Sequence, residues 1–447
     1  MTASSSPSFS LPRHAPGPGA LGSLGYGIGF VRDPFAVLHG APERFGSIVR
    51  FGQGARCVHL IHHPRHVQHV LIDNNRNYEK SSPFGMMKVI FGRGLLFNEG
   101  PSWFAQRRLM QPSFGPKGVA GLSEGIANAI GEVVEKWPQH GAQKVDLEEE
   151  MTILARRVIG QLLFGSELSP EFVAILEAQG SKIKFFLGNL PCTPQNRDYH
   201  GVKRRADAAV YGMIAQRRAA NAEAADMLDA LMATRDKDSG EAMDDTQLRD
   251  EIVTLLFSGF DTTSRTLSWV FHALCHNPEA EKTLHDELDR VLEGRAPTLA
   301  DLPNLTYTQM VIKETMRLFP ANPIIGRRAK ADDEIDGYHI PAGSFFTISP
   351  YLAQRSPELW ENPLQFDPQR FSPENEKKID KFAYYPFGGG PRQCIGKGLA
   401  MMTIPLALAT IASRFRFAAA PDFTVRHDIK VTFQSRDGVP ATRHARH

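Results

Sequence analysis

The chain has 447 residues, of which 51 are Lys or Arg and 49 are Asp or Glu, so its formal net charge is +2. This near balance gives no reason to expect nucleic acid as a partner. Apolar residues make up 42% and charged residues 22%, which is typical of a globular protein. The length allows two or three ordinary domains or one large enzyme domain.

The four cysteines are Cys57, Cys192, Cys275 and Cys394. They lie far apart and form no CxxC pair, so they indicate neither a disulfide framework nor a zinc finger. No run approaches the roughly 20 apolar residues of a membrane helix, and the N-terminus lacks a basic region followed by an apolar core. We therefore expect a cytoplasmic protein with no membrane anchor.

Residues 1–19 are rich in Ser, Pro and Gly, which predicts a flexible leader before a folded region over residues 20–447. Within that region, residues 35–45 form a short predicted helix. The β-branched residues and the alternation of residues 48–51 and 57–61 predict a β-hairpin.

A later predicted helix carries Trp103 and Arg107, which lie four residues apart and therefore share one helical face. An indole N–H and a guanidinium in this geometry can bind one anionic group together. The alternative is an ordinary pair on the protein surface.

Apolar spacing predicts helices over residues 122–137 and 147–164, and an amphipathic helical run over residues 202–231. Between them, residues 185–194 form an apolar segment interrupted by prolines. This segment suits either a lid over a pocket or a buried connection.

The longest predicted helix begins near Asp244 and ends before Pro278, a span of roughly 50 Å. Its middle, residues 258–263, places a glycine, an acid and three hydroxyl residues in an otherwise apolar element. Glycine costs about 1 kcal/mol relative to alanine there, and hydroxyl groups compete for backbone carbonyls. Because apolar residues occur on both sides, we interpret the stretch as functional rather than as a polar stripe facing solvent.

Residues 313–320 predict an apolar helix that ends at Pro320 and carries Glu314 and Arg317 at positions i and i+3. Most such pairs lie on the surface and contribute less than about 1 kcal/mol. Residues 326–343 then predict a strand, a turn and a second strand.

Residues 387–398 isolate one thiol, Cys394, in a backbone with five glycines. Glycine permits positive φ angles, so successive N–H groups can turn toward the sulfur. The apolar run 399–411 predicts a buried helix whose N-terminus points at the same sulfur, which lowers the pKa of a thiol. One thiolate on one loop suits haem iron better than zinc, which takes several Cys or His ligands. The alternative is an ordinary buried cysteine beside a turn.

The order Phe387, Gly-x-Gly, Arg392, Cys394, Gly396 resembles the haem-binding signature of the cytochrome P450 family of haem-thiolate monooxygenases. Three other stretches resemble the family's propionate-binding helix, oxygen-activation motif and Glu-x-x-Arg pair, at residues 103–107, 258–263 and 314–317. Two positions depart from the usual pattern: Ser258 stands where Ala or Gly is commoner, and Thr403 where many members carry an acid. The resemblance extends from about residue 34 to the end.

The resemblance implies a mainly α fold with a smaller β region, the cytochrome P450 fold, in a single large haem-binding domain. It implies haem b as the cofactor, with the Cys394 thiolate as the axial ligand of the iron. The other residues that it assigns to cofactor binding are Trp103, Arg107, Arg327, Phe387 and Arg392. It assigns proton supply during oxygen activation to Asp261 and Thr262. A buried ionic cluster that supports the cysteine loop is expected from Glu314, Arg317 and Arg370.

If the fold carries over, the substrate pocket is lined by the apolar residues Phe84, Met87, Phe185, Phe186, Phe257, Phe260, Ile324, Ile325 and Phe433. Buried apolar area contributes about 25 cal/mol per Å², so such a lining favours a hydrocarbon skeleton. We therefore expect a terpenoid, steroid-like or other polycyclic lipophile rather than a fatty acid, whose carboxylate has only Lys88 or Lys184 as a candidate partner. The alternative for each lining residue is ordinary core.

The implied activity is insertion of one oxygen atom from O2 into a hydrophobic small molecule of secondary metabolism. The sequence shows no flavin or nicotinamide fingerprint, so a ferredoxin with its reductase, or a flavodoxin, is the expected electron donor. The alternatives are a fatty-acid hydroxylase, a haem-thiolate peroxygenase or isomerase, and a non-catalytic haem sensor. The last two do not need the acid and alcohol pair of Asp261 and Thr262, which is intact here.

Overall fold

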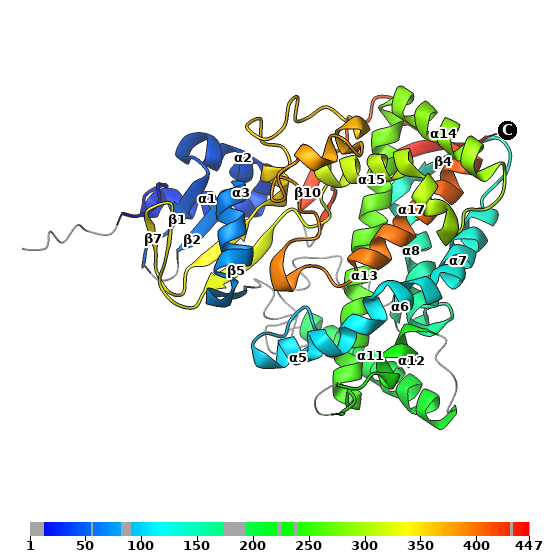
Figure 1. The fold of residues 1–447 in the computed structure, drawn as a ribbon, viewed down its shortest axis with the longest axis horizontal. Helices are drawn as coiled ribbons and strands as arrows, with labels where there is room; N and C mark the ends of the chain where they lie inside the picture. Colours follow the sequence, from blue (N-terminus) through cyan, green and yellow to red (C-terminus); the bar gives the residue numbers. More distant parts are fainter. Residues whose placement is uncertain are drawn as a thin grey trace, which may run out of the picture. The chain divides into compact units, whose positions relative to one another are not determined.

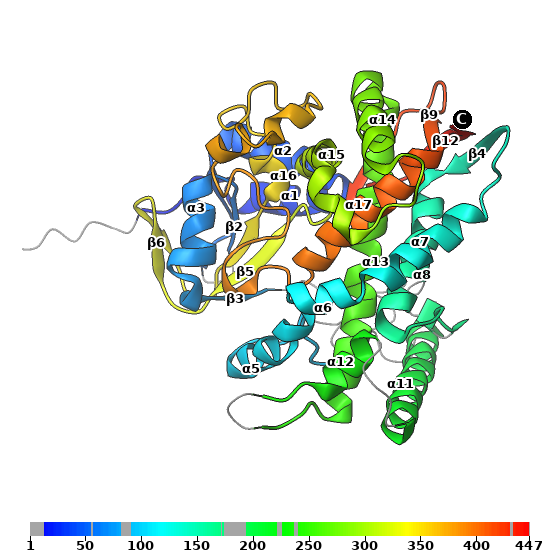
Figure 2. The same cartoon turned by 45° about the vertical axis from the view of Figure 1, so that its right-hand side comes forward.

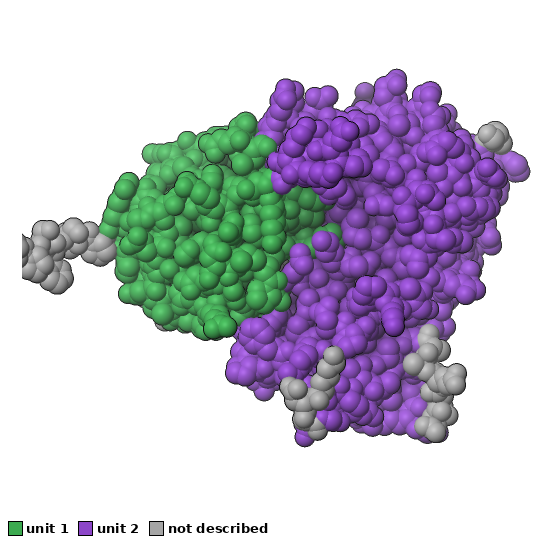
Figure 3. Space-filling view, in the orientation of Figure 1, with its two compact units in different colours: residues 1–81, 324–359, 380–392 green, residues 82–323, 360–379, 393–447 purple. Residues whose placement is uncertain are grey.

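The computed structural model describes residues 13–54, 57–81, 91–170, 172–173, 194–220, 226–236, 240–429 and 432–446. The chain forms two compact units, which Figure 3 shows in different colours. The first unit comprises residues 1–81, 324–359 and 380–392, and the second comprises residues 82–323, 360–379 and 393–447. Each unit is therefore assembled from segments that lie far apart in the sequence.

The first unit is organised around a five-stranded sheet with the strand order β1-β2-β8-β5-β3. The strands are β1 (Ile48–Phe51), β2 (Val58–Ile61), β8 (Phe345–Ile348), β5 (Ile325–Ala329) and β3 (Tyr78–Lys80). Strands β2 and β8 are parallel, whereas the other neighbours are antiparallel. The hairpin expected from the N-terminal alternation is thus one edge of this sheet.

Short helices and a second hairpin complete the first unit: α1 (Ala20–Arg32), α2 (Pro34–Phe45), α3 (Pro64–Gln68), α16 (Pro350–Ala353), β6 (Asp333–Ile335) and β7 (Tyr338–Ile340). Asp33 caps α2 because its side chain accepts a hydrogen bond from the Ala36 N–H. Helix α1 packs along α2 but contributes no buried residue. Its exposed apolar side chains include Leu21, Leu24, Ile28 and Val31.

Side chains from all three segments of the first unit fill its core. Tyr78 from β3 and Phe346 from β8 meet edge to face, with ring centroids 5.3 Å apart. The Tyr78 hydroxyl also donates a hydrogen bond to Asp333, which ties the β6–β7 hairpin to the sheet.

The second unit is mainly helical (Figures 1 and 2). Its helices include α5 (Pro101–Met110), α6 (Pro116–Gly121), α7 (Ser123–Glu135), α8 (Leu147–Phe164), α11 (Pro194–Ala220), α12 (Met227–Ala233), α13 (Asp245–Cys275), α14 (Pro278–Leu292), α15 (Thr306–Leu318) and α17 (Lys397–Arg414). A three-stranded sheet has the order β4 (Ala142–Asp146), β12 (Pro440–Ala445), β9 (Phe415–Ala419). A small hairpin joins β10 (His427–Ile429) and β11 (Phe433–Ser435).

Helix α13, the longest within the described ranges, packs against α8, α15 and α17 (Figures 1 and 2). Its 31 residues span about 46 Å. Asp244 caps its first turn by accepting a hydrogen bond from the Gln247 N–H, and Pro278 begins the following helix. Both ends of α13 therefore follow local signals that the sequence carries.

The predicted helices over residues 122–137 and 147–164 correspond to α7 and α8. The run over residues 202–231 instead divides into α11 and α12, because Asp226 starts a new helix by capping the Asp229 N–H. Among the helices that the structure describes, none is both long enough and apolar enough to cross a membrane.

Candidate active site

Cys394 lies directly before α17, whose N-cap is Gly396. The Gly396 N–H donates a hydrogen bond to the sulfur, and the Arg107 guanidinium adds a positive charge nearby. Both favour the thiolate, but burial of the sulfur among protein atoms outweighs them and raises the pKa of the Cys394 thiol, against the lowering expected from the loop. The residue as a whole is nevertheless exposed.

The other described cysteines are engaged inside the protein. Cys57 is buried in the first unit, where its sulfur lies 3.3 Å from the Ser344 hydroxyl. Cys275, at the end of α13, donates a hydrogen bond to the Phe417 carbonyl at 3.3 Å, and burial raises its pKa to about 12. Of the three cysteines within the described ranges, only Cys394 is exposed and thus placed to bind an external group.

Arg107 and Trp103 project from α5 into different surroundings. One guanidinium nitrogen of Arg107 donates to the Gln393 carbonyl at 2.9 Å, and Nε donates to Gln111 at 3.1 Å. Burial lowers the pKa of Arg107, and the nearby Cys394 side chain opposes that effect. The indole N–H of Trp103 is buried and donates to the Leu95 carbonyl at 3.0 Å. Arg107 therefore lies beside the cysteine loop, while the Trp103 donor is used within the protein.

Two adjacent acids of α13 fix the chain that leads into α5, and neither was predicted from the sequence. Asp250 accepts a hydrogen bond from the Arg93 N–H at 2.6 Å. Glu251 is fully buried and accepts from the Leu95 N–H at 3.0 Å and from the Gln106 amide of α5. The Leu95 carbonyl also accepts the hydrogen bond from the Trp103 indole of α5. These acids therefore help to fix the position of α5 relative to α13.

Three hydroxyl side chains at the centre of α13 bond to carbonyls four residues earlier in the helix. Ser258 donates to the Thr254 carbonyl at 2.8 Å, Thr262 to Ser258 at 2.9 Å, and Thr266 to Thr262 at 2.8 Å. This arrangement satisfies each hydroxyl donor and leaves its oxygen able to accept. The polar positions of the stretch are half-buried, so they do not form an open solvent face.

Asp261 of α13 is linked, directly or through Arg265, to two other segments of the second unit. Its carboxylate pairs with Arg265 at 3.2 Å and accepts a hydrogen bond from the Thr432 hydroxyl at 2.6 Å. Arg265 in turn pairs with Glu148 of α8 at 2.9 Å. Arg265 could have been recognised from its i+4 spacing to Asp261. Thr432 and Glu148 carry no such signal, because only the tertiary fold brings them to α13.

Glu314, Arg317 and Arg370 lie together in the second unit. Arg317 donates two hydrogen bonds to the Glu314 carboxylate, at 2.7 and 2.8 Å, and both side chains are fully buried. Arg370 lies 3.4 Å from the same carboxylate, and the Arg317 guanidinium lies 4.9 Å from the centre of the Trp360 ring. Burial raises the pKa of the Glu314 carboxyl, and the charge of Arg317 opposes this. The cluster joins α15 to the segment that carries Arg370.

The first unit holds the other residues assigned to the cofactor. Arg327 of β5 is buried, and it donates to the carbonyl of the preceding residue at 2.8 Å. Phe387 and Arg392 are half-buried in the segment before Cys394. Gly390 in that segment has φ +71°, and a Cβ there would lie 1.9 Å from the Leu71 carbonyl oxygen. Only glycine fits this position.

Of the apolar residues expected around the substrate, some lie outside the described part of the chain and the others can be placed. Phe84, Met87, Phe185 and Phe186 lie outside the described residues. Phe257 and Phe260 are both buried on α13. The Phe257 ring lies 4.8 Å from that of Phe91, and the Arg156 guanidinium lies 5.7 Å from the Phe260 ring.

Phe433 is fully buried in an aromatic cluster, with its ring 5.2 Å from Trp269 and 5.9 Å from Phe319. The Trp269 indole also donates to the Phe433 carbonyl at 3.1 Å. Phe433 is thus placed as a core residue of the second unit. In the first unit, Ile324 and Ile325 are half-buried, and Ile325 packs against the core.

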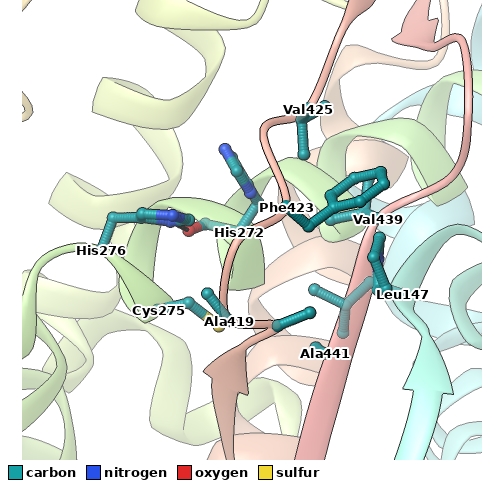
Figure 4. A pocket seen from close by; sticks show the side chains of 11 residues that line it. Leu147, His272, Cys275, His276, Ala419, Phe423, Val425, Val439 and Ala441 are labelled. Atoms are coloured by element: carbon teal, nitrogen blue, oxygen red, sulfur yellow. Dashed lines mark hydrogen bonds between the residues drawn. The ribbon is translucent and has the colours of Figure 1, made fainter.

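The part of the second unit that the structure describes includes two hollows of different size. Figure 4 shows a cavity of about 10 Å³ at the end of α13, lined by side chains that include His272, Cys275, Phe423 and Val439. It has room for about one water molecule. A hollow of about 390 Å³ between α5 and the start of α13 is lined partly by the acids Asp236, Glu241, Asp244 and Asp250. The first is too small and the second too acidic for a lipophilic substrate.

A family model described as cytochrome P450 matches residues 16–432. The chain belongs to the cytochrome P450 family. Among similar P450s, cyclooctatin synthase of Streptomyces melanosporofaciens is 35% identical over 93% of this chain and 92% of that protein. Cyclooctat-9-en-7-ol 5-monooxygenase of the same organism is 33% identical, covering 91% and 90% of the two chains. Pentalenene oxygenase of Streptomyces avermitilis is 30% identical over 92% of each.

The haem domain of cytochrome P450DA, a solved structure, matches this P450 with a TM-score of 0.86 over 98% of both chains. The sequences are only 22% identical, so this likeness concerns the fold. Together with the single family model that spans both units, it confirms the expected P450 fold, mainly α with a smaller β region.

The P450 family and fold imply a haem bound through a thiolate. The described residues fit that group. Cys394 is an exposed residue whose sulfur accepts a hydrogen bond from a backbone N–H, which favours the thiolate that binds iron. Arg107 is a guanidinium beside the same loop, which suits a carboxylate of the haem.

Proposed function

We propose that this P450 is a monooxygenase that inserts one oxygen atom from O2 into a terpenoid. The observation that carries the proposal is similarity over about nine-tenths of the chain to relatives named for terpenoid oxygenation. A steroid-like or other polycyclic lipophile is the next substrate class, because it presents the same apolar skeleton.

The cofactor in this proposal is haem b, with Cys394 as the axial ligand and Arg107 as a donor to a haem carboxylate. When bound, the haem supplies the iron chemistry that activates O2. Trp103 is the second donor on α5, once its indole N–H leaves the Leu95 carbonyl. The family resemblance adds Arg327, Phe387 and Arg392 as further cofactor-binding residues.

Thr262 and Asp261 are the residues that we assign to proton supply. The Thr262 hydroxyl donates its hydrogen to the Ser258 carbonyl, so its oxygen retains lone pairs that can accept a hydrogen bond from a water molecule. Asp261 adjoins it on α13 and brings a carboxylate that can exchange protons with solvent.

Electrons come from a separate protein in this proposal, either a ferredoxin with its reductase or a flavodoxin. The motivation is that the sequence carries no flavin or nicotinamide fingerprint. Purified protein with NAD(P)H alone is expected to turn over no substrate, whereas addition of a ferredoxin and its reductase restores turnover. We place the enzyme in the cytoplasm, where such donors are reduced.

The thiolate assignment is tested by the absorption spectrum of the reduced, carbon monoxide-bound protein. Wild type is expected to show the strongly red-shifted Soret band of a thiolate-bound haem, and Cys394→Ser is expected to lose it. Cys275→Ser is the matched control, because that thiol is engaged with the Phe417 carbonyl, and it should keep the band. A wild-type band like that of a histidine-ligated haem would contradict the assignment.

The substrate class is tested by titrating ferric protein with a panel of neutral terpenoids and a panel of long-chain fatty acids. Displacement of water from the iron reports binding in both panels. Terpenoids are expected to bind more tightly, because an apolar pocket penalises a carboxylate. Tight binding of fatty acids alone, abolished by Lys88→Ala or Lys184→Ala, would favour a fatty-acid hydroxylase instead.

The reaction class is tested with the best-bound terpenoid. Product that carries ¹⁸O from ¹⁸O2 and requires reductant identifies a monooxygenase. Product formed equally well with hydrogen peroxide and no reductant identifies a peroxygenase, and oxygen-independent product identifies an isomerase.

A further inference from the structure

The carboxylate of Asp261 is held at both oxygens. Oδ1 lies 3.2 Å from Nε of Arg265, one turn later on α13. Oδ2 accepts a hydrogen bond from the Thr432 hydroxyl at 2.6 Å. Thr432 is 171 residues away in the sequence and directly precedes β11. Two donors from different segments therefore fix the plane of this carboxylate.

Arg265 is itself held by a second acid. It lies 2.9 Å from Glu148 at the start of α8, and the other oxygen of Glu148 accepts a hydrogen bond from the Ser435 N–H at 2.9 Å. The side chains of Asp261, Arg265 and Glu148 are each less than one-fifth exposed. Burial raises the pKa of Glu148, and the charge of Arg265 is the main opposing influence. Arg265 therefore bridges two acids, one on its own helix and one on α8, rather than forming an isolated i, i+4 pair.

The residue after Thr432, Phe433, is hydrogen-bonded through both its N–H and its carbonyl. The N–H of Phe433 donates to the Ala321 carbonyl at 2.9 Å, and the Phe433 carbonyl accepts from the Trp269 indole. Thr432 itself is buried. Its hydroxyl is therefore presented to Asp261 by backbone that is anchored on both the α15 side and α13.

We propose that Arg265, Thr432 and Glu148 form a clamp that sets the orientation of the Asp261 carboxylate for proton delivery in the monooxygenase reaction. This inference rests on the proposed function, because it gives Asp261 its task. The three are positioning residues: each acts through Asp261. The Asp261 clamp limits how far the carboxylate can rotate while it takes a proton from solvent and passes it on.

The deciding variant is Thr432→Val, which removes the hydroxyl and keeps the branched shape. It is expected to raise the share of reducing equivalents lost as hydrogen peroxide about tenfold and to change the solvent isotope effect on turnover in the same direction as Asp261→Asn. Thr432→Ser, which restores the hydroxyl, should return both values toward wild type. Arg265→Gln and Glu148→Gln should shift them as well.

Thr410→Val is the matched control, because Thr410 is buried and its hydroxyl bonds to the carbonyl four residues earlier in its own helix, α17. It should leave peroxide yield and isotope effect at wild-type values. Substrate affinity, read from the ferric spectrum, should stay the same in all clamp variants. A positioning role changes the proton-dependent step without changing binding.

A second measurement does not depend on turnover. Thermal unfolding of substrate-free ferric protein is compared for Thr432→Val, Asp261→Asn and the double variant. If the contact exists in solution, the two losses in melting temperature are not additive. Additive losses would overturn the clamp.

The clamp would also be overturned if Thr432→Val had the peroxide yield and isotope effect of wild type while Asp261→Asn had altered values. If Asp261→Asn itself behaves as wild type, the clamp falls together with the proton role of Asp261. A thiolate-type carbon monoxide spectrum and oxygen-dependent turnover in that protein would still support the monooxygenase. The failure of the clamp and the failure of the proposed function are therefore distinguishable.

Discussion

The hydroxyl of Thr262 donates a hydrogen bond to the Ser258 carbonyl within α13, and its oxygen can still accept one. Because its hydrogen bonds to a carbonyl that already belongs to the helix, loss of the hydroxyl leaves no unpaired group behind. The structural cost of Thr262→Ala is therefore expected to be within about 0.5 kcal/mol.

Thr262→Ala is expected to keep haem content and terpenoid binding while it diverts reducing equivalents to hydrogen peroxide. Thr262→Ser, which keeps an oxygen at the same position, should remain coupled. The measurement is peroxide formed per reducing equivalent consumed. Unchanged coupling in Thr262→Ala would show that the residue only packs within the helix.

Protonation of His272 is expected to lower the stability of the folded protein at acid pH. Its ring lies 5.4 Å from Trp269 and 4.5 Å from His276, and burial, followed by the charges of His276 and His427, lowers its pKa from 6.5 to about 4. The unfolded chain therefore takes up the proton first as the pH falls. Stability should drop between about pH 6.5 and pH 4, by on the order of 3 kcal/mol for this residue.

The test is the urea midpoint of wild type and His272→Phe at pH 7 and at pH 4.5. The phenyl ring keeps the aromatic contact and cannot take up a proton, so the variant should lose less stability on acidification. Other buried histidines with lowered pKa, His59, His62 and His285, leave a common slope in both proteins. Equal losses in the two proteins would contradict the prediction.

At the scale of elements, α15 carries one fully buried ion pair and one pair near the surface. Mutation of the buried pair is expected to cost more stability than mutation of the surface pair. Glu314→Gln keeps the shape but leaves the Arg317 guanidinium buried without a counter-charge, which costs about 3–5 kcal/mol. Neighbouring Lys313 pairs with the half-exposed Glu376, so Lys313→Gln should cost less than about 1 kcal/mol. Denaturant unfolding of the two variants compares buried and surface pairs on the same helix. Similar small losses in both would show that the pair contributes little.

Helix α1 is expected to behave in the opposite way, because none of its residues is buried and several of its apolar side chains are exposed. Replacement of its exposed apolar residues by glutamine, a good helix former, should leave the thermal midpoint nearly unchanged. The combined variant carries Leu21→Gln, Leu24→Gln, Ile28→Gln and Val31→Gln. It should also scatter less light at high concentration, since exposed apolar patches promote association.

The control for α1 is Leu38→Gln on α2, where the side chain is 1% exposed. Placing an amide in that core should lower the midpoint strongly. A comparable loss in the α1 variant would mean that α1 is buried in solution.

For the molecule as a whole, the features that the sequence predicted are those encoded within a few residues. The ends of α13 follow from Asp244 and Pro278, and α8 follows from its apolar spacing. The family motifs located the Cys394 loop and the Glu314 and Arg317 pair because each is a short ordered string. Arg370 was predicted to join that pair only through the family resemblance, and it lies 3.4 Å from Glu314.

The contacts that escaped prediction join segments whose distance depends on packing. The bond from Thr432 to Asp261 requires that the residue before β11 reach α13, and no local pattern encodes this. The same holds for Glu251. It lies in an apolar helix and accepts hydrogen bonds from a backbone N–H and from an amide of α5. The pKa of Cys394 was predicted in the wrong direction, because burial raises it more than the Gly396 N–H and the Arg107 charge lower it.

The strand order of the first unit has a consequence for synthesis on the ribosome. Strand β2 has its partner β1 available once both have emerged, but the partner for its other edge is β8, which follows roughly 280 residues later. At about 5–20 residues per second, that interval lasts roughly 15 to 60 s. During this time the growing chain presents an unpaired strand edge, the kind of surface that invites pairing with other chains. A sheet begun by the earliest strands can thus be closed only after most of the second unit has been made.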